Sequence, residues 1–264
     1  MKRALLILPL LVQAVVSSPL NAGDPQPKYG PKGTPKAIPL ALSNEYFRDP
    51  KHPAPAFWAL ISNYIPQTTG ASCATATLAM TLNAARAHLE KTASDAVITE
   101  NTLWENVNAD LWKEQPNERH YKGEGHGIAL DQLGRIAEAA FKKYGFPKVK
   151  LKVVHVQDKS SLTTPTGTRA EIITDLKSLS DKTFIMANFN QKSFTHDAEV
   201  GHFAPVGAFD EKRGRVLILD PDRGSGALNG YYEPYWVSIE SFMDGMNTLD
   251  SSNKRYRGYI LVQL

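Results

Sequence analysis

Residues 73–91 read CATATLAMTLNAARAHLEK. The segment is rich in Ala, Leu and Met, and Ala74, Leu78, Leu82 and Ala85 recur at helical spacing along one stripe. This pattern predicts a buried helix that begins at or near Cys73.

The loop before this helix places Cys73 at a loop-to-helix junction. Pro66 and Gly70 interrupt regular structure, and Ser72 offers a side-chain cap for the first helical amides. The positive end of a helix dipole favours a thiolate, which is the nucleophilic form of cysteine. Cys73 is the single cysteine of the chain, so it forms no internal disulfide. A reactive nucleophile and an inert, buried cysteine both remain open.

After the first helix, periodicity predicts further helices and then, in the C-terminal third of the chain, consecutive strands. The expected helices cover 131–144 and 169–179, and the expected strands cover 149–156, 183–189, 201–209, 215–220 and 257–264. Consecutive strands with a turn at 210–214 indicate an antiparallel sheet. We therefore expect an α+β domain, with a helical part packed on the sheet, rather than a doubly wound parallel fold.

The hairpin GHFAPVGAFDEKRGRVLILD (201–220) brings a histidine and an aspartate together. Folding it symmetrically about Glu211 sets His202 opposite Asp220, with Cβ atoms roughly 5 Å apart. A carboxylate beside a histidine orients the ring and stabilises the imidazolium formed when a thiol loses its proton. A structural cross-strand hydrogen bond is the alternative, and Asp222 is a rival for the carboxylate role.

Gln67 lies six residues before Cys73 in the loop YIPQTTGASC. Oxyanion intermediates need donors, which usually come from the nucleophile's own N–H and a nearby side-chain amide. Gln67 is the candidate for that amide, and a solvent-facing loop glutamine is the alternative.

The first 22 residues have the layout of a secretory signal peptide. Lys2 and Arg3 precede an apolar run over 4–12, and small residues follow up to Ala22. The run is too short to span a bilayer and Pro9 interrupts it. We expect cleavage near Ala22, a periplasmic or secreted protein, and no membrane contact after cleavage.

A Pro-rich stretch at 23–39 predicts an extended tether, so folded structure should begin near Leu40 and continue to residue 264 as one domain, or as two lobes that share a core. Removing Lys2 and Arg3 lowers the formal net charge from +3 to +1, far from the basic excess of a nucleic-acid binder. Nucleic acid is therefore not an expected partner.

Four segments together resemble the phytochelatin synthase family in order and spacing. They are QTTGASCATATLAMTLN (67–83), GIALDQLGRIAEA (127–139), the hairpin 201–220 and MNTLDSSNKRYRGYILV (246–262). The resemblance implies a papain-like fold and cleavage of the Cys–Gly bond of glutathione through a γ-glutamylcysteinyl thioester. It implies Cys73 as nucleophile, His202 as base and acid, Asp220 as its partner, and Gln67 as oxyanion donor.

The same resemblance implies a set of substrate contacts. Arg257 is similar to the family's receptor for a substrate carboxylate, Asp250 to the acid facing the γ-glutamyl amino group, and Asn188 to a polar contact with that group. Gly201 is the fourth residue predicted to bind the substrate. A zwitterionic head needs one anion and one cation, and an arginine fork suits a carboxylate.

The chain also departs from the family pattern. Ala74 follows the nucleophile where the family usually has glycine, and the insert 223–234 replaces a shorter stretch after the acid. Both bear on access to the thiol and on a second substrate, so hydrolysis and transfer to a second glutathione both stay open.

Two other functions compete with this one. A general papain-like periplasmic peptidase or amidase would not need Arg257 and Asp250. A non-enzymatic thiol-peptide or metal-binding protein would use His120, Glu124 and His126 as ligands. We expect no resident cofactor or metal, because the resemblance implies that metal acts through metal-thiolate substrates. The oligomeric state stays open, with a homodimer as one option.

Overall fold

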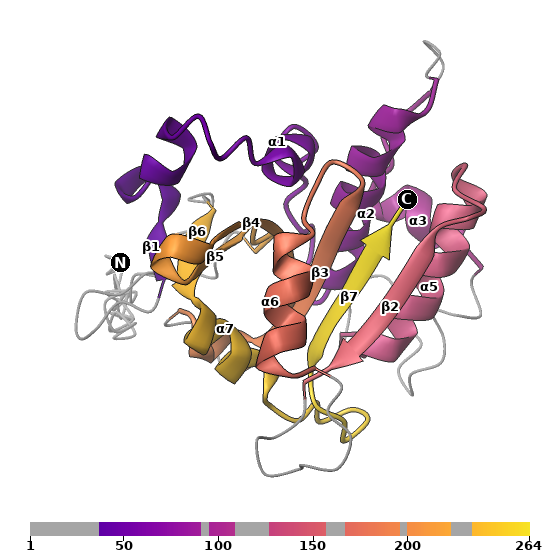
Figure 1. The fold of residues 1–264 in the computed structure, drawn as a ribbon. Coiled ribbons are helices and arrows are strands. Elements are labelled where there is room, and N and C mark those ends of the chain that lie inside the picture. The colour runs from indigo at the N-terminus through magenta and orange to yellow at the C-terminus, as the bar shows by residue number, and fades with distance from the viewer. Residues whose placement is uncertain (1–36, 91–94, 109–126, 157–166, 196–199, 223–233) are drawn as a thin grey trace, which may run out of the picture.

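A computed structural model describes residues 37–90, 95–108, 127–156, 167–195, 200–222 and 234–264, and places helices on both faces of one sheet (Figure 1). The seven strands pair antiparallel in the order β1-β6-β5-β4-β3-β7-β2. The strands are β1 (Ala37–Pro39), β2 (Lys150–His155), β3 (Thr183–Asn190), β4 (Gly201–Asp210), β5 (Arg215–Ile218), β6 (Tyr235–Ser238) and β7 (Gly258–Gln263). The α-helices are α1 (Pro55–Ile61), α2 (Cys73–Ala85), α3 (Glu100–Asn106), α5 (Leu130–Lys143), α6 (Arg169–Lys177) and α7 (Ile239–Met246).

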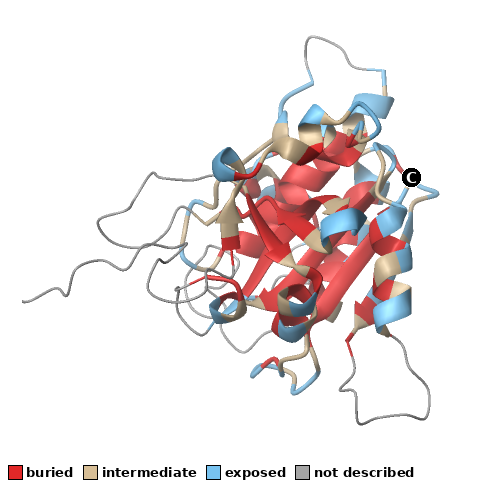
Figure 2. Ribbon diagram, turned by 60° about the vertical axis from the view of Figure 1, so that its left-hand side comes forward, coloured by how far each residue is buried: buried red, intermediate tan, exposed pale blue. Residues whose placement is uncertain are grey.

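The sheet separates two hydrophobic clusters. One lies between the sheet and helices α1, α2, α3 and α5, and the other lies under α6 and α7. Figure 2 shows the buried positions gathered in the strands and in the helices that pack on them. This arrangement confirms the predicted α+β class and is consistent with a papain-like fold.

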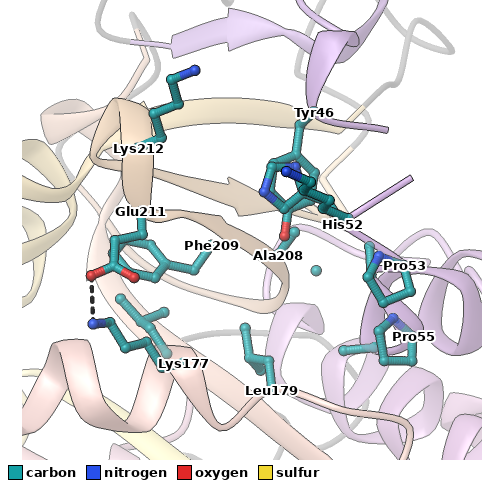
Figure 3. A pocket seen from close by; sticks show the side chains of 15 residues that line it. Tyr46, His52, Pro53, Pro55, Lys177, Leu179, Ala208, Phe209, Glu211 and Lys212 are labelled. Carbon is teal, nitrogen blue, oxygen red and sulfur yellow. Dashed lines mark ion pairs between the residues drawn. The ribbon is translucent and has the colours of Figure 1, made fainter. Parts of the chain in front are cut away.

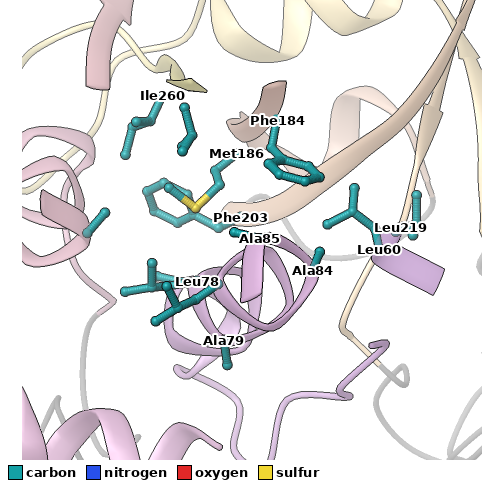
Figure 4. Packing of buried hydrophobic residues seen from close by; sticks show 14 of the residues in the cluster. Leu60, Leu78, Ala79, Ala84, Ala85, Phe184, Met186, Phe203, Leu219 and Ile260 are labelled. Carbon is teal, nitrogen blue, oxygen red and sulfur yellow. The ribbon is translucent and has the colours of Figure 1, made fainter. Parts of the chain in front are cut away.

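Helix α2 is buried on every side, as its apolar sequence predicts. All thirteen of its residues are buried, and a helix that is apolar all round belongs inside a protein. Figure 4 shows Ala85 of this helix beside Phe203 of the sheet, and Leu78 and Phe184 belong to the same cluster. The α-helix ends at Ala85, earlier than the predicted helix over 73–91, because the chain tightens into a 3₁₀ turn.

The predicted helix over 131–144 is confirmed as α5. Gly145 follows it with φ of 105°, a left-handed conformation that glycine adopts without strain. The predicted strand over 149–156 is confirmed as β2, but its burial differs from simple alternation. Val153 is 36% exposed whereas Val154 is 2% exposed. Val153 lies beside Gly134 of α5, and Val154 packs in the hydrophobic cluster under α6 and α7.

The β4–β5 hairpin has a different register from the predicted one. Symmetry about Glu211 is wrong, because a 3₁₀ turn (Glu211–Arg213) displaces the pairing so that Asp210 faces Arg215. A β-bulge before Ala208 then shifts the register by one residue, and Val206 faces Ile218.

The bulge decides which side of the sheet Asp220 takes. Beyond it, the Leu219 N–H donates to the Pro205 carbonyl at 3.0 Å, which continues the shifted register and sets Asp220 beside Ala204. His202 and Ala204 point to the same face, because side chains alternate along a strand. Without the bulge, Asp220 would face Pro205 and point away from His202.

At the N-terminal side, β1 pairs with β6, so ordered structure begins by Ala37 and the predicted tether is too long by three residues. The predicted signal peptide, the remaining tether and residues 223–233 of the insert lie outside the described residues. Within the described ranges, no helix combines the length and apolarity needed to cross a bilayer.

Candidate active site

Cys73 is the first residue of α2 and is 7% exposed. Its sulfur lies close enough to the ring of His202 to raise the pKa of that ring. The thiol that the sequence predicts at a helix start therefore lies beside a proton acceptor. Ala74, the departure from the family pattern, is 2% exposed and packs in the core cluster.

The predicted side-chain cap by Ser72 is wrong. Ser72 occupies the N-cap position of α2 but makes no capping hydrogen bond. Its Oγ instead accepts from the Thr69 N–H at 3.1 Å and donates to the Thr69 carbonyl at 3.2 Å. The tight turn before the helix thus occupies the hydroxyl, and Ser72 leaves the first-turn amides of α2 uncapped.

His202 and Asp220 form a fully buried pair. His202 Nε2 lies 2.6 Å from Asp220 Oδ1, and the two residues are 3% and 0% exposed. With Nε2 directed at the carboxylate, Nδ1 is the ring nitrogen left for Cys73. The pair predicted from the hairpin is therefore present, as diagonal rather than directly opposed neighbours.

Further donors hold the Asp220 carboxylate. Tyr235 Oη donates to Oδ2 at 2.7 Å, and the Asp222 N–H donates to Oδ1 at 2.8 Å. The rival carboxylate of Asp222 instead accepts from Gln191 Nε2 at 3.0 Å. Asp220 is therefore the acid that meets His202. Sequence reasoning did not identify Tyr235, because its position in β6 lies beyond the insert and no motif links it to the hairpin.

The charges of this cluster favour a protonated ring. Burial opposes a charge on His202, but the Asp220 carboxylate and the Cys73 sulfur outweigh it and raise the pKa of His202 to about 10. An imidazolium beside a sulfur favours the thiolate. The arrangement can therefore hold a thiolate–imidazolium pair ready for attack on an electrophilic carbon.

The loop that carries Gln67 is tied to the acid side of the site. Its N–H donates to the Pro221 carbonyl at 2.9 Å, directly after Asp220. The side-chain Oε1 of Gln67 is buried and has no hydrogen-bond partner among the described residues. The loop before Cys73 is therefore anchored beside Asp220, and the amide oxygen of Gln67 has no hydrogen-bond partner in the part of the chain that the structure describes.

The four predicted substrate contacts form one connected group. Arg257 Nη1 donates to Asp250 Oδ2 at 3.1 Å and to Asn188 Oδ1 at 3.4 Å. Asn188 Nδ2 in turn donates to the His202 carbonyl at 3.1 Å. A Cβ at Gly201 would lie 2.2 Å from Arg257 Nη1, so glycine provides the space for the guanidinium. Arg257 Nε is buried without an acceptor in the described part of the chain.

Glu100 is a buried acid beside the nucleophile loop that sequence reasoning did not identify. It is 2% exposed and its carboxyl accepts from the Thr68 N–H at 3.3 Å and from the Thr68 hydroxyl. Burial raises the pKa of Glu100 against its hydrogen bonds from Thr68 and Ser72. An acid in the first turn of a helix usually indicates a helix start exposed to solvent. The sequence position of Glu100 therefore did not predict that its side chain is buried beside the loop.

A cavity of about 380 Å³ lies elsewhere, around the turn of the β4–β5 hairpin (Figure 3). Tyr46, His52 and Phe209 line it together with Lys177 and Glu211, whose charges pair at 2.5 Å. None of the residues around Cys73 lines this cavity. The reactive groups, rather than cavity size, therefore locate the candidate active site.

The described residues contain no group of three or more His, Cys, Asp or Glu side chains that could hold a metal ion. The predicted alternative ligands His120, Glu124 and His126 lie outside the described residues.

Comparison with known proteins places most of the chain in one family model. The model described as phytochelatin synthase matches residues 41–259. This match includes each residue of the site described above.

Individual relatives are similar over shorter stretches. Glutathione gamma-glutamylcysteinyltransferase 3 of Lotus japonicus is 31% identical over 83 residues, which are 31% of this chain and 16% of the relative. Glutathione gamma-glutamylcysteinyltransferase 2 of Arabidopsis thaliana is 31% identical over 85 residues, 32% of this chain and 17% of the relative. The glutathione gamma-glutamylcysteinyltransferase of Schizosaccharomyces pombe is 36% identical over 63 residues, 24% of this chain and 14% of the relative. The matched stretch thus spans less than a fifth of each relative.

Proposed function

Because this chain belongs to the phytochelatin synthase family, we propose that it cleaves the Cys–Gly peptide bond of glutathione through a thioester on Cys73. The observation that carries the proposal is the His202 ring held between Asp220 and the sulfur of Cys73 at the start of α2. The relatives whose names state a glutathione γ-glutamylcysteinyltransferase activity support the choice of substrate.

The first half-reaction forms the thioester. The Cys73 thiolate, whose proton resides on His202, adds to the cysteinyl carbonyl carbon of glutathione. The oxyanion of the tetrahedral intermediate is stabilised by the Cys73 N–H and the Gln67 side-chain amide. The intermediate collapses as the C–N bond breaks, His202 returns its proton to the departing nitrogen, and glycine leaves.

The second half-reaction releases the acyl group. His202 takes a proton from water or from the amino group of a second glutathione as that group attacks the thioester carbon. The C–S bond then breaks and Cys73 leaves as the thiolate. Water yields γ-glutamylcysteine, and a second glutathione yields a peptide longer by one γ-glutamylcysteinyl unit. The measured ratio of these two products decides between hydrolysis and transfer.

The γ-glutamyl head is held by the cluster around Arg257. One guanidinium nitrogen already bonds Asp250 and Asn188, and the buried Nε is left for the substrate carboxylate. Asp250 accepts from the substrate amino group. The cluster connects to the His202 backbone through Asn188, so substrate binding and the general base share one set of hydrogen bonds.

Intact-protein mass spectrometry after mixing with glutathione tests the mechanism. We expect a γ-glutamylcysteinyl adduct on Cys73, together with free glycine, and neither product with Cys73→Ala. Because the chain has one cysteine, the adduct needs no peptide mapping to be assigned. Glycine release that persists in Cys73→Ala would exclude this nucleophile.

A general peptidase or amidase remains the second candidate, and the isomer α-glutamyl-cysteinyl-glycine separates the two. It carries the same scissile bond but a different head group. We expect Arg257→Lys to raise KM for glutathione, and the matched variant Arg255→Lys at an exposed position to leave KM unchanged. Equal cleavage of both isomers would favour the peptidase.

We further propose export, on the strength of the predicted signal peptide at 1–22, and metal action through metal-thiolate substrates rather than a resident ion. N-terminal sequencing of the mature protein from a periplasmic fraction tests the first. Equilibrium dialysis of cadmium with and without glutathione tests the second, since binding without glutathione would contradict it.

A further inference from the structure

Glu100 holds the loop that leads into Cys73 through hydrogen bonds from Thr68. Its carboxyl accepts from the Thr68 N–H and from the Thr68 hydroxyl, and the Ser72 hydroxyl lies close enough to lower its pKa. Thr68 follows Gln67 and Ser72 precedes Cys73, so one buried side chain contacts the neighbours of both residues.

Ser72 is held in a conformation that prevents capping. An N-cap residue usually has extended backbone angles and bonds an amide of the first turn through its side chain. Ser72 has φ of −98° and ψ of 13°, and its hydroxyl is directed to Thr69 and Glu100 instead. Serine is among the strongest N-cap residues, so release of this loop would favour rotation into the capping conformation.

A capping hydroxyl would compete with the reaction. The uncapped first-turn amides of α2 are the donors that stabilise a sulfur anion and the oxyanion that follows it. A serine oxygen bonded to one of them would withdraw that donor. Burial raises the pKa of Glu100, which lessens the negative charge that this carboxyl places beside Cys73.

We propose that Glu100 is a positioning residue, which by holding Thr68 and Ser72 keeps the Ser72 hydroxyl from capping α2 and so leaves the first-turn amides open to the reacting groups. This inference rests on the proposed function for its catalytic meaning. Its effect on the thiol alone can be measured without glutathione.

The test is the pH dependence of Cys73 alkylation by iodoacetamide, which reports only this thiol because the chain has one cysteine. Glu100→Ala should raise the alkylation midpoint by about half to one pH unit, the scale of one serine cap. Glu100→Gln keeps the shape, its amide oxygen can still accept from the Thr68 N–H and hydroxyl, and its NH₂ group can donate to the Ser72 oxygen, so it should leave the midpoint unchanged. The double variant Glu100→Ala with Ser72→Ala should return to the wild-type midpoint, because it has no hydroxyl to cap with.

Thermal unfolding of each variant separates this role from a loss of folding. If Glu100→Ala does not fold, Thr68→Val takes its place and should give a smaller upward shift that Ser72→Ala also reverses. An unchanged midpoint in the folded single variant, or no recovery in the double variant, overturns the proposal. A wild-type protein that does not cleave glutathione, with the alkylation pattern intact, would instead overturn the proposed substrate.

Discussion

At the scale of single residues, a backbone N–H and a tyrosine hydroxyl donate to the two oxygens of Asp220. This difference predicts that Asn and Ala at position 220 will lower kcat by different amounts. Asp220→Asn should lower kcat by about 10- to 100-fold, whereas Asp220→Ala should lower it by about 1000-fold or more. The Asp222 N–H is a fixed donor to Oδ1, so it keeps an amide oxygen, rather than the NH₂ group, against His202. Tyr235 can reverse its hydroxyl and accept from that NH₂ group.

Asn at this position therefore preserves the ring tautomer and removes only the charge. Steady-state kinetics of both variants, with circular dichroism as a folding control, check this difference. Equal losses in the two variants would mean that the orientation of the His202 ring does not depend on Asp220.

Gly201→Ala is predicted to weaken substrate binding. A methyl group there would meet Arg257 Nη1 at 2.2 Å, so the guanidinium must move away from Asp250 and Asn188. We expect KM for glutathione to rise about tenfold, equivalent to roughly 1.4 kcal/mol, with a smaller change in kcat.

Gly127→Ala is the matched control for that measurement. A methyl group at Gly127 meets no atom within 4 Å, and its KM should stay at the wild-type value. A normal KM for Gly201→Ala would show that the position of Arg257 does not limit substrate binding.

Local sequence patterns could identify Cys73, His202 and Asp220, whereas the substrate contacts such as Arg257 followed from the family resemblance. The spacing within one hairpin relates His202 to Asp220, and the end of a loop marks Cys73. Glu100 and Tyr235 act through contacts between distant segments, which no periodicity records. The cap by Ser72 was wrong because helix-start statistics do not register competition from Thr69 for the same hydroxyl.

At the scale of elements, the burial of α2 predicts a large cost for truncating its side chains. Leu78 is 0% exposed in the core cluster, and Leu78→Ala should lower the free energy of unfolding by about 2 to 5 kcal/mol. Urea titration followed by circular dichroism measures the loss.

Leu42→Ala is the control, because Leu42 is 80% exposed and its truncation should change the free energy of unfolding by less than about 0.5 kcal/mol. Comparable losses at the two positions would show that α2 does not carry the core.

The helices α2 and α5 could be predicted from sequence, and so could the strands β4, β5 and β7, but β6 (Tyr235–Ser238) was not predicted. Helix α7 was not predicted, because its eight residues include Gly245 and lie between two strands. The bulge in β4 was also missed. Gly207 gives no sign by itself that the chain will add a residue there, yet the bulge determines the face on which Asp220 lies.

At the scale of the whole molecule, the raised pKa of His202 predicts that stability falls in alkali. The folded state holds the His202 proton up to a pKa of about 10, while the unfolded state releases it near 6.5. The folded state therefore binds more protons between these values, and the free energy of unfolding should decrease as pH rises from about 6.5 to 9.5. The slope contributed by one group is at most about 1.4 kcal/mol per pH unit.

Urea midpoints across this pH range measure the effect, and Asp220→Asn should flatten the slope because it removes the charge that holds the proton. A slope equal to that of wild type in this variant would assign the pH dependence to other groups.

The order of strands could not be predicted from sequence. Local patterns indicate that strands exist and that neighbours such as β4 and β5 form a hairpin. They do not show that β7 enters between β3 and β2, or that β1 joins the opposite edge beside β6. These pairings depend on which faces the helices cover, and that is a property of the assembled core.

The position of β7 has a consequence for how the protein is made. In the described sheet, β2 pairs only with β7. The strands β3, β4, β5 and β6 lie between these two in the sequence. On a ribosome, β2 would emerge early and wait with its backbone groups and apolar side chains unpaired until β7 is translated. We expect nascent chains stalled before β7 to be cleaved rapidly by protease and to bind chaperones, and chains that include β7 to become resistant.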